Sequence, residues 1–168
     1  MKERPILFSG PMVQALLAGT KTQTRRVVKK QPSEEWLPKV GRYCPTRIAR
    51  DGEAFPGPET FGASDENEDR PCPYGQPGDR LWVRETWTEN LVLPLKDRGP
   101  GDYIYRADLG PTGVSKWSAQ WKPSIFMRRA ACRILLEITA VRVERLQAIT
   151  EADALAEGCR VIKTQEMQ

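Results

Sequence analysis

The sequence predicts a mixed α+β fold that consists mainly of β-strands and forms a small barrel with short helices. Apolar segments are short and separated by turn residues, and the two helical patterns each span only about two turns. In addition, 14 prolines and 13 glycines interrupt a chain of 168 residues. A chain of this length is expected to form one domain, residues 1–168, with a sizeable core.

The first predicted elements are a strand, a helix and a second strand. Residues 6–8 are apolar and form the first strand, and Ser9 can cap the helix that follows. Apolar residues recur in that helix at helical spacing until Gly19 ends it. The β-branched residues in the stretch 20–28 then favour a strand.

The middle of the chain is predicted to contain a long insertion and two strands. Residues 29–80 are rich in proline and glycine with little periodicity, which predicts an irregular insertion. A tight turn at 76–79 leads into the strongest strand pattern, residues 81–87, and residues 103–106 form another strand.

The last third is predicted to contain a long strand and a capped helix. Residues 133–145 alternate between apolar and polar side chains, and a change of parity at 140–141 indicates a bulge. Thr150 and Asp153 are spaced as a capping box, so a helix is expected from Glu151 to Glu157, ending at Gly158.

Composition excludes several classes of function. The chain has no histidine, which removes Ser-His and Cys-His nucleophile pairs and histidine-ligated metals. Its four cysteines lack zinc spacing, so we expect no metal and no cofactor; a clip between Cys44 and Cys72 is the alternative to incidental thiols. The charged N-terminus and the lack of an apolar run of ~20 residues predict a cytoplasmic protein without a membrane span.

The charged residues are unevenly distributed, although the net charge is only +4. Five bases and no acid lie between Lys21 and Lys30, whereas five acids and no base lie between Glu59 and Asp69. Such a basic segment suits contact with phosphates, for which Arg25, Arg26 and Lys29 are the candidates. An ordinary solvated surface would have the same composition.

The strand at 81–87 carries two further candidates for nucleic-acid binding, Arg84 and Trp87. Trp82 and Trp87 are candidates for stacking on bases. They lie five residues apart and therefore face opposite sides of a strand, so one of them is expected to enter the core. Arg84 and Glu85 in an otherwise apolar strand indicate either a cleft or a structural ion pair.

Three segments taken together resemble the ASCH domain, a family of PUA-like β-barrels, and most closely its phage- and prophage-encoded members. The segments are residues 17–25 (LAGTKTQTR), 77–87 (PGDRLWVRETW) and 146–158 (LQAITEADALAEG), with Cys72-Pro73-Tyr74-Gly75 before the second. The resemblance implies a PUA-like small barrel and recognition of RNA or a nucleotide in a cleft beside it.

The resemblance also implies a catalytic site. Some small bacterial members of the family are amidohydrolases acting on N4-acetylcytidine, and their pattern places a nucleophile on Thr24, an activating base on Lys21 and a proton donor or orienting acid on Glu157. A threonine hydroxyl needs such a base. On a regular strand Lys21 and Thr24 would point to opposite faces, so a turn or a bulge is required to bring them together.

The chain departs from the family pattern in two places. Relatives of the phage type often carry His, Pro and Trp where this chain has Phe126, Arg128 and Ala130. They also continue after the segment that corresponds to residues 146–158 into a further helix and a closing strand. We therefore expect the barrel of this chain to lack its closing strand.

Three functions follow as hypotheses. The first is an RNA- or nucleotide-binding protein of phage or prophage origin. The second is a small hydrolase, either an amidohydrolase or a ribonuclease, that uses Lys21, Thr24 and Glu157. The third is a phage accessory protein that has kept the fold without any catalysis. The oligomeric state is not predicted.

Overall fold

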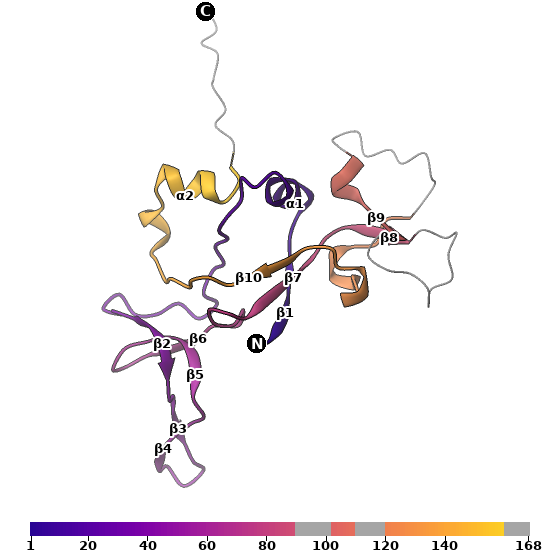
Figure 1. Cartoon of the computed structure of the whole chain (residues 1–168). Coiled ribbons are helices and arrows are strands. Elements are labelled where there is room, and N and C mark those ends of the chain that lie inside the picture. Colours follow the sequence, from indigo (N-terminus) through magenta and orange to yellow (C-terminus); the bar gives the residue numbers. More distant parts are fainter. Residues whose placement is uncertain (90–101, 110–119, 160–168) are drawn as a thin grey trace, which may run out of the picture. The chain divides into compact units, whose positions relative to one another are not determined.

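The computed structural model describes residues 1–89, 102–109 and 120–159, which form a mixed α+β structure consisting mainly of strands, with two α-helices (Figure 1). None of the helices described is long and apolar enough to cross a membrane. The strands are β1 (Glu3–Leu7), β2 (Lys39–Tyr43), β3 (Thr46–Ile48), β4 (Ala54–Pro56), β5 (Thr60–Ser64), β6 (Asp69–Pro71), β7 (Arg80–Arg84), β8 (Trp87–Glu89), β9 (Tyr103–Tyr105) and β10 (Leu135–Glu137). The helices are α1 (Gly10–Leu17) and α2 (Glu151–Ala156), with short 3-10 turns η3 (Arg106–Leu109), η4 (Ser124–Phe126), η5 (Arg129–Ala131) and η6 (Leu146–Ala148).

The chain divides into two compact units. Unit 1 comprises residues 1–4, 26–81 and 136–145, and unit 2 comprises residues 5–25, 82–135 and 146–168. The boundaries fall within the strands of the sheet β1-β7-β10, so each unit contains a part of that sheet. The predicted single domain therefore corresponds to two clusters of contacts built from interleaved segments.

Unit 1 contains the whole segment 29–80, which the sequence predicts to be irregular. The structure instead shows five short strands there, β2 to β6. Strand β5 pairs with both β2 and β6, and the hairpin β3-β4 continues the ribbon that β2 and β5 begin (Figure 1). Strands β3 and β4 escape detection because they are exposed along their whole length and have no buried face to impose alternation.

The core of unit 2 is an aromatic cluster around Trp87. Its ring packs edge-on against Tyr103, with centroids 5.3 Å apart, and Tyr105 donates a hydrogen bond to the carbonyl of Ala131 at 2.7 Å. Met127, Ala131 and Cys132 complete the cluster. The predicted strand 81–87 is divided here, because Thr86 accepts a hydrogen bond from Arg106 and the chain then pairs with β9.

Both helices follow the sequence prediction. Helix α1 begins after Ser9, has a proline in its first turn and ends before Gly19, whose φ is +70°. Helix α2 begins at a capping box in which the hydroxyl of Thr150 accepts from the Asp153 N–H and the Asp153 carboxylate accepts from the Thr150 N–H. Gly158 ends it with φ +87°. Caps and positive-φ glycines are local signals, which explains why these elements could be predicted.

Two predicted strands differ from the structure. Residues 20–28 form no strand. The backbone N–H groups of Thr22 and Gln23 both donate to the carbonyl of Ala156, whereas consecutive residues of a β-strand do not share one acceptor on a neighbouring strand. The long strand at 133–145 is reduced to β10, which pairs with β7, and no residue between 138 and 145 is in a strand. The predicted loss of a closing strand after Gly158 lies outside the described residues.

Candidate functional site

The end of α1 turns the chain so that Lys21 faces into unit 2. The amides of Thr20 and Lys21 both bond the carbonyl of Ala15, at 2.9 and 3.1 Å, and Gly19 supplies the left-handed conformation that this turn needs. Lys21 then forms an isolated antiparallel bridge with Glu157. The turn expected after Gly19 is therefore present, and it places Lys21 beside the end of α2.

Lys21 is buried, with only 4% of its surface exposed. Its Nζ donates to the carbonyl oxygens of Gln23 at 2.7 Å and Glu157 at 2.8 Å, and lies 5.7 Å from the centroid of the Phe8 ring. Carbonyl acceptors and an aromatic face compensate an ammonium group for lost water. Lys21 thus joins two segments that are 136 residues apart in the sequence.

The carboxylate of Glu157 is bound by Arg25, which sequence analysis assigned to phosphate contact. Arg25 Nη1 lies 2.7 Å from Glu157 Oε1, and its Nη2 lies 3.2 Å from Asp153 Oδ2. Gln23 Nε2 donates to the carbonyl and to Oδ1 of Asp153, at 2.9 and 3.0 Å. The charge of Arg25 is therefore balanced by two carboxylates, which weakens its candidacy as a phosphate ligand.

Asp153 is an acid of this network with a strongly lowered pKa. Hydrogen bonds from the Gln23 side chain and from Thr150, with the charge of Arg25 as a smaller contribution, hold the pKa of Asp153 far below its usual range. Sequence analysis identified Asp153 only as a capping residue. Its spacing from Thr150 predicts that role but carries no signal of the contacts with Gln23 and Arg25.

The three residues predicted for catalysis are brought together only in part. Lys21 contacts the main-chain carbonyl of Glu157, whereas the Glu157 carboxylate is held by Arg25. Thr24 is half-buried and lies between Gln23 and Arg25, which both contact Asp153. The segment therefore presents Thr24 beside the junction of residues 17–25 with residues 146–158. The ammonium group of Lys21 at this junction is engaged by carbonyl groups.

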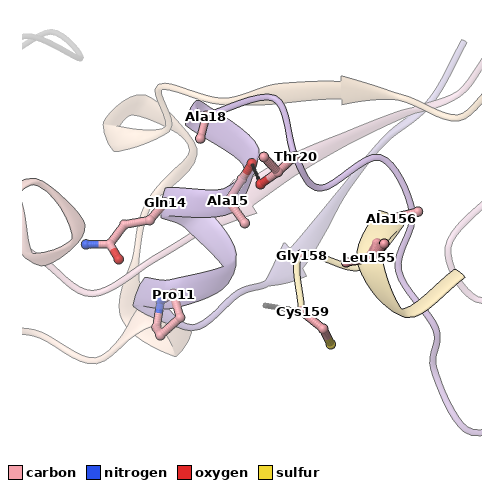
Figure 2. A pocket seen from close by; sticks show the side chains of 9 residues that line it. All are labelled: Pro11, Gln14, Ala15, Ala18, Thr20, Leu155, Ala156, Gly158 and Cys159. Atoms are coloured by element: carbon pink, nitrogen blue, oxygen red, sulfur yellow. Dashed lines mark hydrogen bonds between the residues drawn. The ribbon is translucent and has the colours of Figure 1, made fainter. Parts of the chain in front are cut away.

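An open pocket of about 790 Å³ lies next to this junction (Figure 2). Helix α1 forms one wall, and the end of α2 with the residues that follow it forms the other. The lining residues are Pro11, Gln14, Ala15, Ala18, Thr20, Leu155, Ala156, Gly158 and Cys159. The lining is mostly apolar and includes the sequence neighbours of Lys21 and Glu157, while those two side chains do not line it.

The remaining nucleic-acid candidates lie in different surroundings. Arg26 and Lys29 are exposed in unit 1. In unit 2, Arg84 is half-buried and stacks on Trp82, with its guanidinium carbon 5.3 Å from the ring centroid. Trp87 is 2% exposed within the aromatic core, so the proposal that it stacks on bases is wrong: its neighbours occupy both the edge and the face of its ring.

Glu85 takes part in a structural ion pair, but its partner is Arg133 and not the adjacent Arg84. Arg133 Nε and Nη2 donate to the two carboxylate oxygens of Glu85 at 2.8 and 2.9 Å, and its Nη1 reaches Asp108 at 2.8 Å. Glu85 is 1% exposed, and Arg133 also lies over the ring of Tyr105. The sequence showed the unusual charge of Glu85, while its partner lies 48 residues away.

Within residues 1–89, 102–109 and 120–159, no group of three or more Cys, Asp or Glu side chains is arranged to hold a metal ion. Cys44 and Cys72 are both free thiols.

Comparison of the chain with protein-family models, with curated proteins and with solved structures finds no match. The resemblance to the ASCH family therefore depends on the three sequence segments alone.

Proposed function

We propose that the chain is an RNA- or nucleotide-binding cytoplasmic protein of the ASCH type with a PUA-like barrel, and that its ligand lies beside the junction of residues 17–25 and 146–158. The contact of Lys21 with Glu157 carries this proposal. It joins two of the three segments on which the resemblance depends, at the positions where the family pattern locates its site.

The pocket next to the junction has a lining that suits a small, flat ligand. Its apolar walls of alanine and leucine suit a nucleobase, and its open side leaves room for the sugar and phosphate of a nucleotide. In unit 1, the exposed Arg26 and Lys29 have the charge that suits contact with phosphates of RNA.

Binding is tested with fluorescently labelled RNA and with mononucleotides. Ala18 is exposed and lines the pocket, so Ala18→Phe should narrow it with little effect on the core. We expect this variant to bind mononucleotides at least about tenfold more weakly, a change of ~1.4 kcal/mol. Ala152→Phe, at an exposed position of α2 that does not line the pocket, is the matched control. Equal binding by both variants would contradict a ligand in this pocket.

A hydrolase is the second candidate, favoured by the presence of Lys21, Glu157 and the half-buried Thr24 around one junction. Wild-type protein should then convert N4-acetylcytidine to cytidine and acetate, or shorten RNA, and Thr24→Val should abolish this turnover without loss of binding. Thr24→Val is preferred to a change at Lys21, because Lys21 holds buried carbonyl groups and its removal would also affect folding. Binding without turnover would leave only the binding function, and absence of both would favour the non-enzymatic phage accessory protein.

A further inference from the structure

Strand β2 forms one edge of the sheet β2-β5-β6 in unit 1 (Figure 1). The N–H of Cys72 donates to the carbonyl of Phe61, so Phe61 directs its backbone groups from β5 toward β6. Backbone groups alternate between the two sides of a strand, so the next residue, Gly62, directs its groups toward β2, where it lies opposite Gly41. The neighbours of Gly41 therefore direct their backbone groups away from β5.

Those neighbours, Val40 and Arg42, present their N–H and C=O groups at the outer edge of the sheet. Both residues are exposed, and in the part of the chain that the structure describes no backbone hydrogen bond outside the paired strands involves either of them. The opposite edge, β6, is protected: the carbonyl of Asp69 accepts from Nη1 of Arg70 at 2.6 Å, and Pro71 has no N–H. An unprotected edge such as that of β2 can add a further strand.

The sequence of β2 is complementary to a second copy of itself. Two copies related by a two-fold axis pair antiparallel, and full overlap places Val40 opposite Arg42 of the second copy, so that these residues exchange their outward backbone groups. A shift by one residue would place outward groups opposite inward ones. A shift by two would place Arg42 opposite Arg42 of the second copy or opposite Pro38, which has no N–H. Full overlap is therefore the favoured register.

Gly41 would lie on the two-fold axis of this pairing. It would face Gly41 of the second copy in a pair without mutual hydrogen bonds, the type in which the Cα atoms lie closest, about 4.5 Å apart. Nothing lies within 4 Å of a Cβ added at Gly41, so this face of β2 is open to a neighbour. Lys39 points to the same face and would lie opposite Tyr43 of the second copy, which brings a cation next to an aromatic ring.

We propose that the chain forms a homodimer in which the β2 strands of two copies pair antiparallel about Gly41 and join their sheets into one. Strand β2 has only five residues, so the interface is small and the dimer should be weak, with a Kd in the micromolar range or above. The proposal concerns unit 1 and does not depend on the pocket in unit 2.

Sedimentation velocity of the full chain over a series of concentrations measures the equilibrium between monomer and dimer. Val40→Arg would face Arg42 of the second copy and should weaken the dimer by at least about threefold, whereas Val40→Glu would face the same guanidinium and should strengthen it by about threefold. A folding defect cannot give opposite signs at one exposed position. Val27→Arg and Val27→Glu, at an exposed valine of unit 1 outside β2, are the matched controls and should leave the dimer unchanged.

A disulfide tests the register. Two cysteines on the axis would lie within the Cα separation of ~4.4–6.8 Å that a disulfide spans. Gly41→Cys should therefore form a covalent dimer under mild oxidation, in a background in which Cys44, Cys72 and Cys159 are replaced by serine. Val27→Cys in the same background should remain monomeric under reducing and oxidising conditions alike.

Three outcomes would overturn the proposal. The first is a wild-type chain that stays monomeric at every concentration, and the second is a dimer that responds equally to Val40→Arg and Val40→Glu. The third is a monomer that binds a labelled polyglutamate peptide and loses this binding in Val40→Glu, because the edge would then accept an acidic partner. Mononucleotide binding, measured on the same variants, should equal that of the wild type, so failure of the dimer and failure of the proposed function are distinguishable.

Discussion

Lys21 shows how a single charged side chain can organise a junction from inside the protein. An ammonium group excluded from water needs compensation, and here it receives it from two carbonyl oxygens and the face of Phe8. The same contacts give the carbonyl of Glu157 a donor at the end of a helix, where carbonyl groups lack partners within the helix. Lys21 therefore has a structural role whether or not it also assists a reaction.

Replacing Lys21 with methionine should lower the free energy of unfolding by about 2 kcal/mol or more. Methionine keeps the aliphatic stem but leaves two carbonyl oxygens without this donor, and each such loss costs ~1–3 kcal/mol when the group is buried. Urea unfolding followed by circular dichroism measures the change. Lys30→Met, at an exposed position, should stay within about 0.5 kcal/mol of the wild type. A similarly small effect at Lys21 would show that its contacts do not stabilise the fold.

At the scale of single residues, the sequence could predict positions but not partners. The resemblance directs attention to Lys21 and Glu157, and these do meet. The basic segment makes Arg25 a candidate phosphate ligand, whereas the structure pairs Arg25 with a carboxylate 132 residues away. Such a pairing depends on the approach of two distant segments, and no local pattern contains that information.

Helix α2 lies against the end of α1 at a position where only glycine fits. A Cβ added at Gly158 would lie 2.7 Å from the Cβ of Ala15, and the residue also has φ +87°. Both the contact and the conformation therefore exclude a side chain. The close approach brings the backbone of residues 146–158 within reach of Lys21.

Gly158→Ala should destabilise the protein more than Gly78→Ala does. Gly78 has nearly the same conformation, φ +86°, but nothing lies within 4 Å of its added Cβ, so its replacement measures the backbone strain alone, about 1–2 kcal/mol. The additional loss at Gly158 measures the clash with Ala15. Thermal or urea unfolding of both variants provides the comparison, and equal losses would mean that α1 and α2 can separate freely.

The ion pair between Glu85 and Arg133 should contribute far more to the free energy of unfolding than an exposed ion pair does. Glu85→Gln leaves the half-buried guanidinium of Arg133 without its main partner, and we expect a loss of about 3 kcal/mol in the free energy of unfolding. The exposed pair Arg42–Glu59 supplies the control, because Glu59→Gln should cost less than about 1 kcal/mol. Losses of similar size at the two sites would contradict a structural role for the buried pair.

At the scale of elements, the signal available in the sequence depends on burial. Both helices carry caps and glycine stops, and both could be predicted from them. Strands β3 and β4 are held by pairing with each other and have no buried face, so their sequences show no alternation. Residues 138–145 show the opposite case, because alternation is present there without a strand.

The whole molecule should lose stability in acid. The pKa lies below its ordinary value in four of the described carboxyl groups, those of Asp65, Glu68, Asp79 and Asp153. The main cause in each is a hydrogen bond donated to the carboxylate. The unfolded chain therefore takes up protons before the folded chain does. The stabilisation is fully present above the unfolded pKa values of about 4 and is lost as the pH falls through and below them.

Urea unfolding at a series of pH values between 7 and 3 measures this dependence. The free energy of unfolding should be nearly constant down to about pH 5 and then fall. Asp79→Asn removes the acceptor for the backbone N–H of Lys2 and the partner of Arg4, so it should be less stable at pH 7 and show a smaller fall in acid. Stability that rises between pH 5 and pH 3 would contradict the direction of these pKa shifts.

The fold class of the whole molecule could be predicted correctly as mixed α+β and mainly β. The division into two units built from interleaved segments could not, because it depends on which distant segments pair in space. The described strands form two three-stranded and two two-stranded sheets and no closed barrel, so the small barrel remains a prediction.

Because α2 depends on its neighbours, the order of this helix should report whether a ligand is bound at the junction. A helix of six residues is too short to persist alone in water, so its order depends on the contacts that Lys21, Gln23 and Arg25 make with it. Hydrogen exchange at the backbone amides of Ala154 and Glu157, which bond within the helix, should therefore slow whenever a ligand steadies residues 20–25. Occupancy of the junction could be followed in this way without labelling the ligand and before its identity is known.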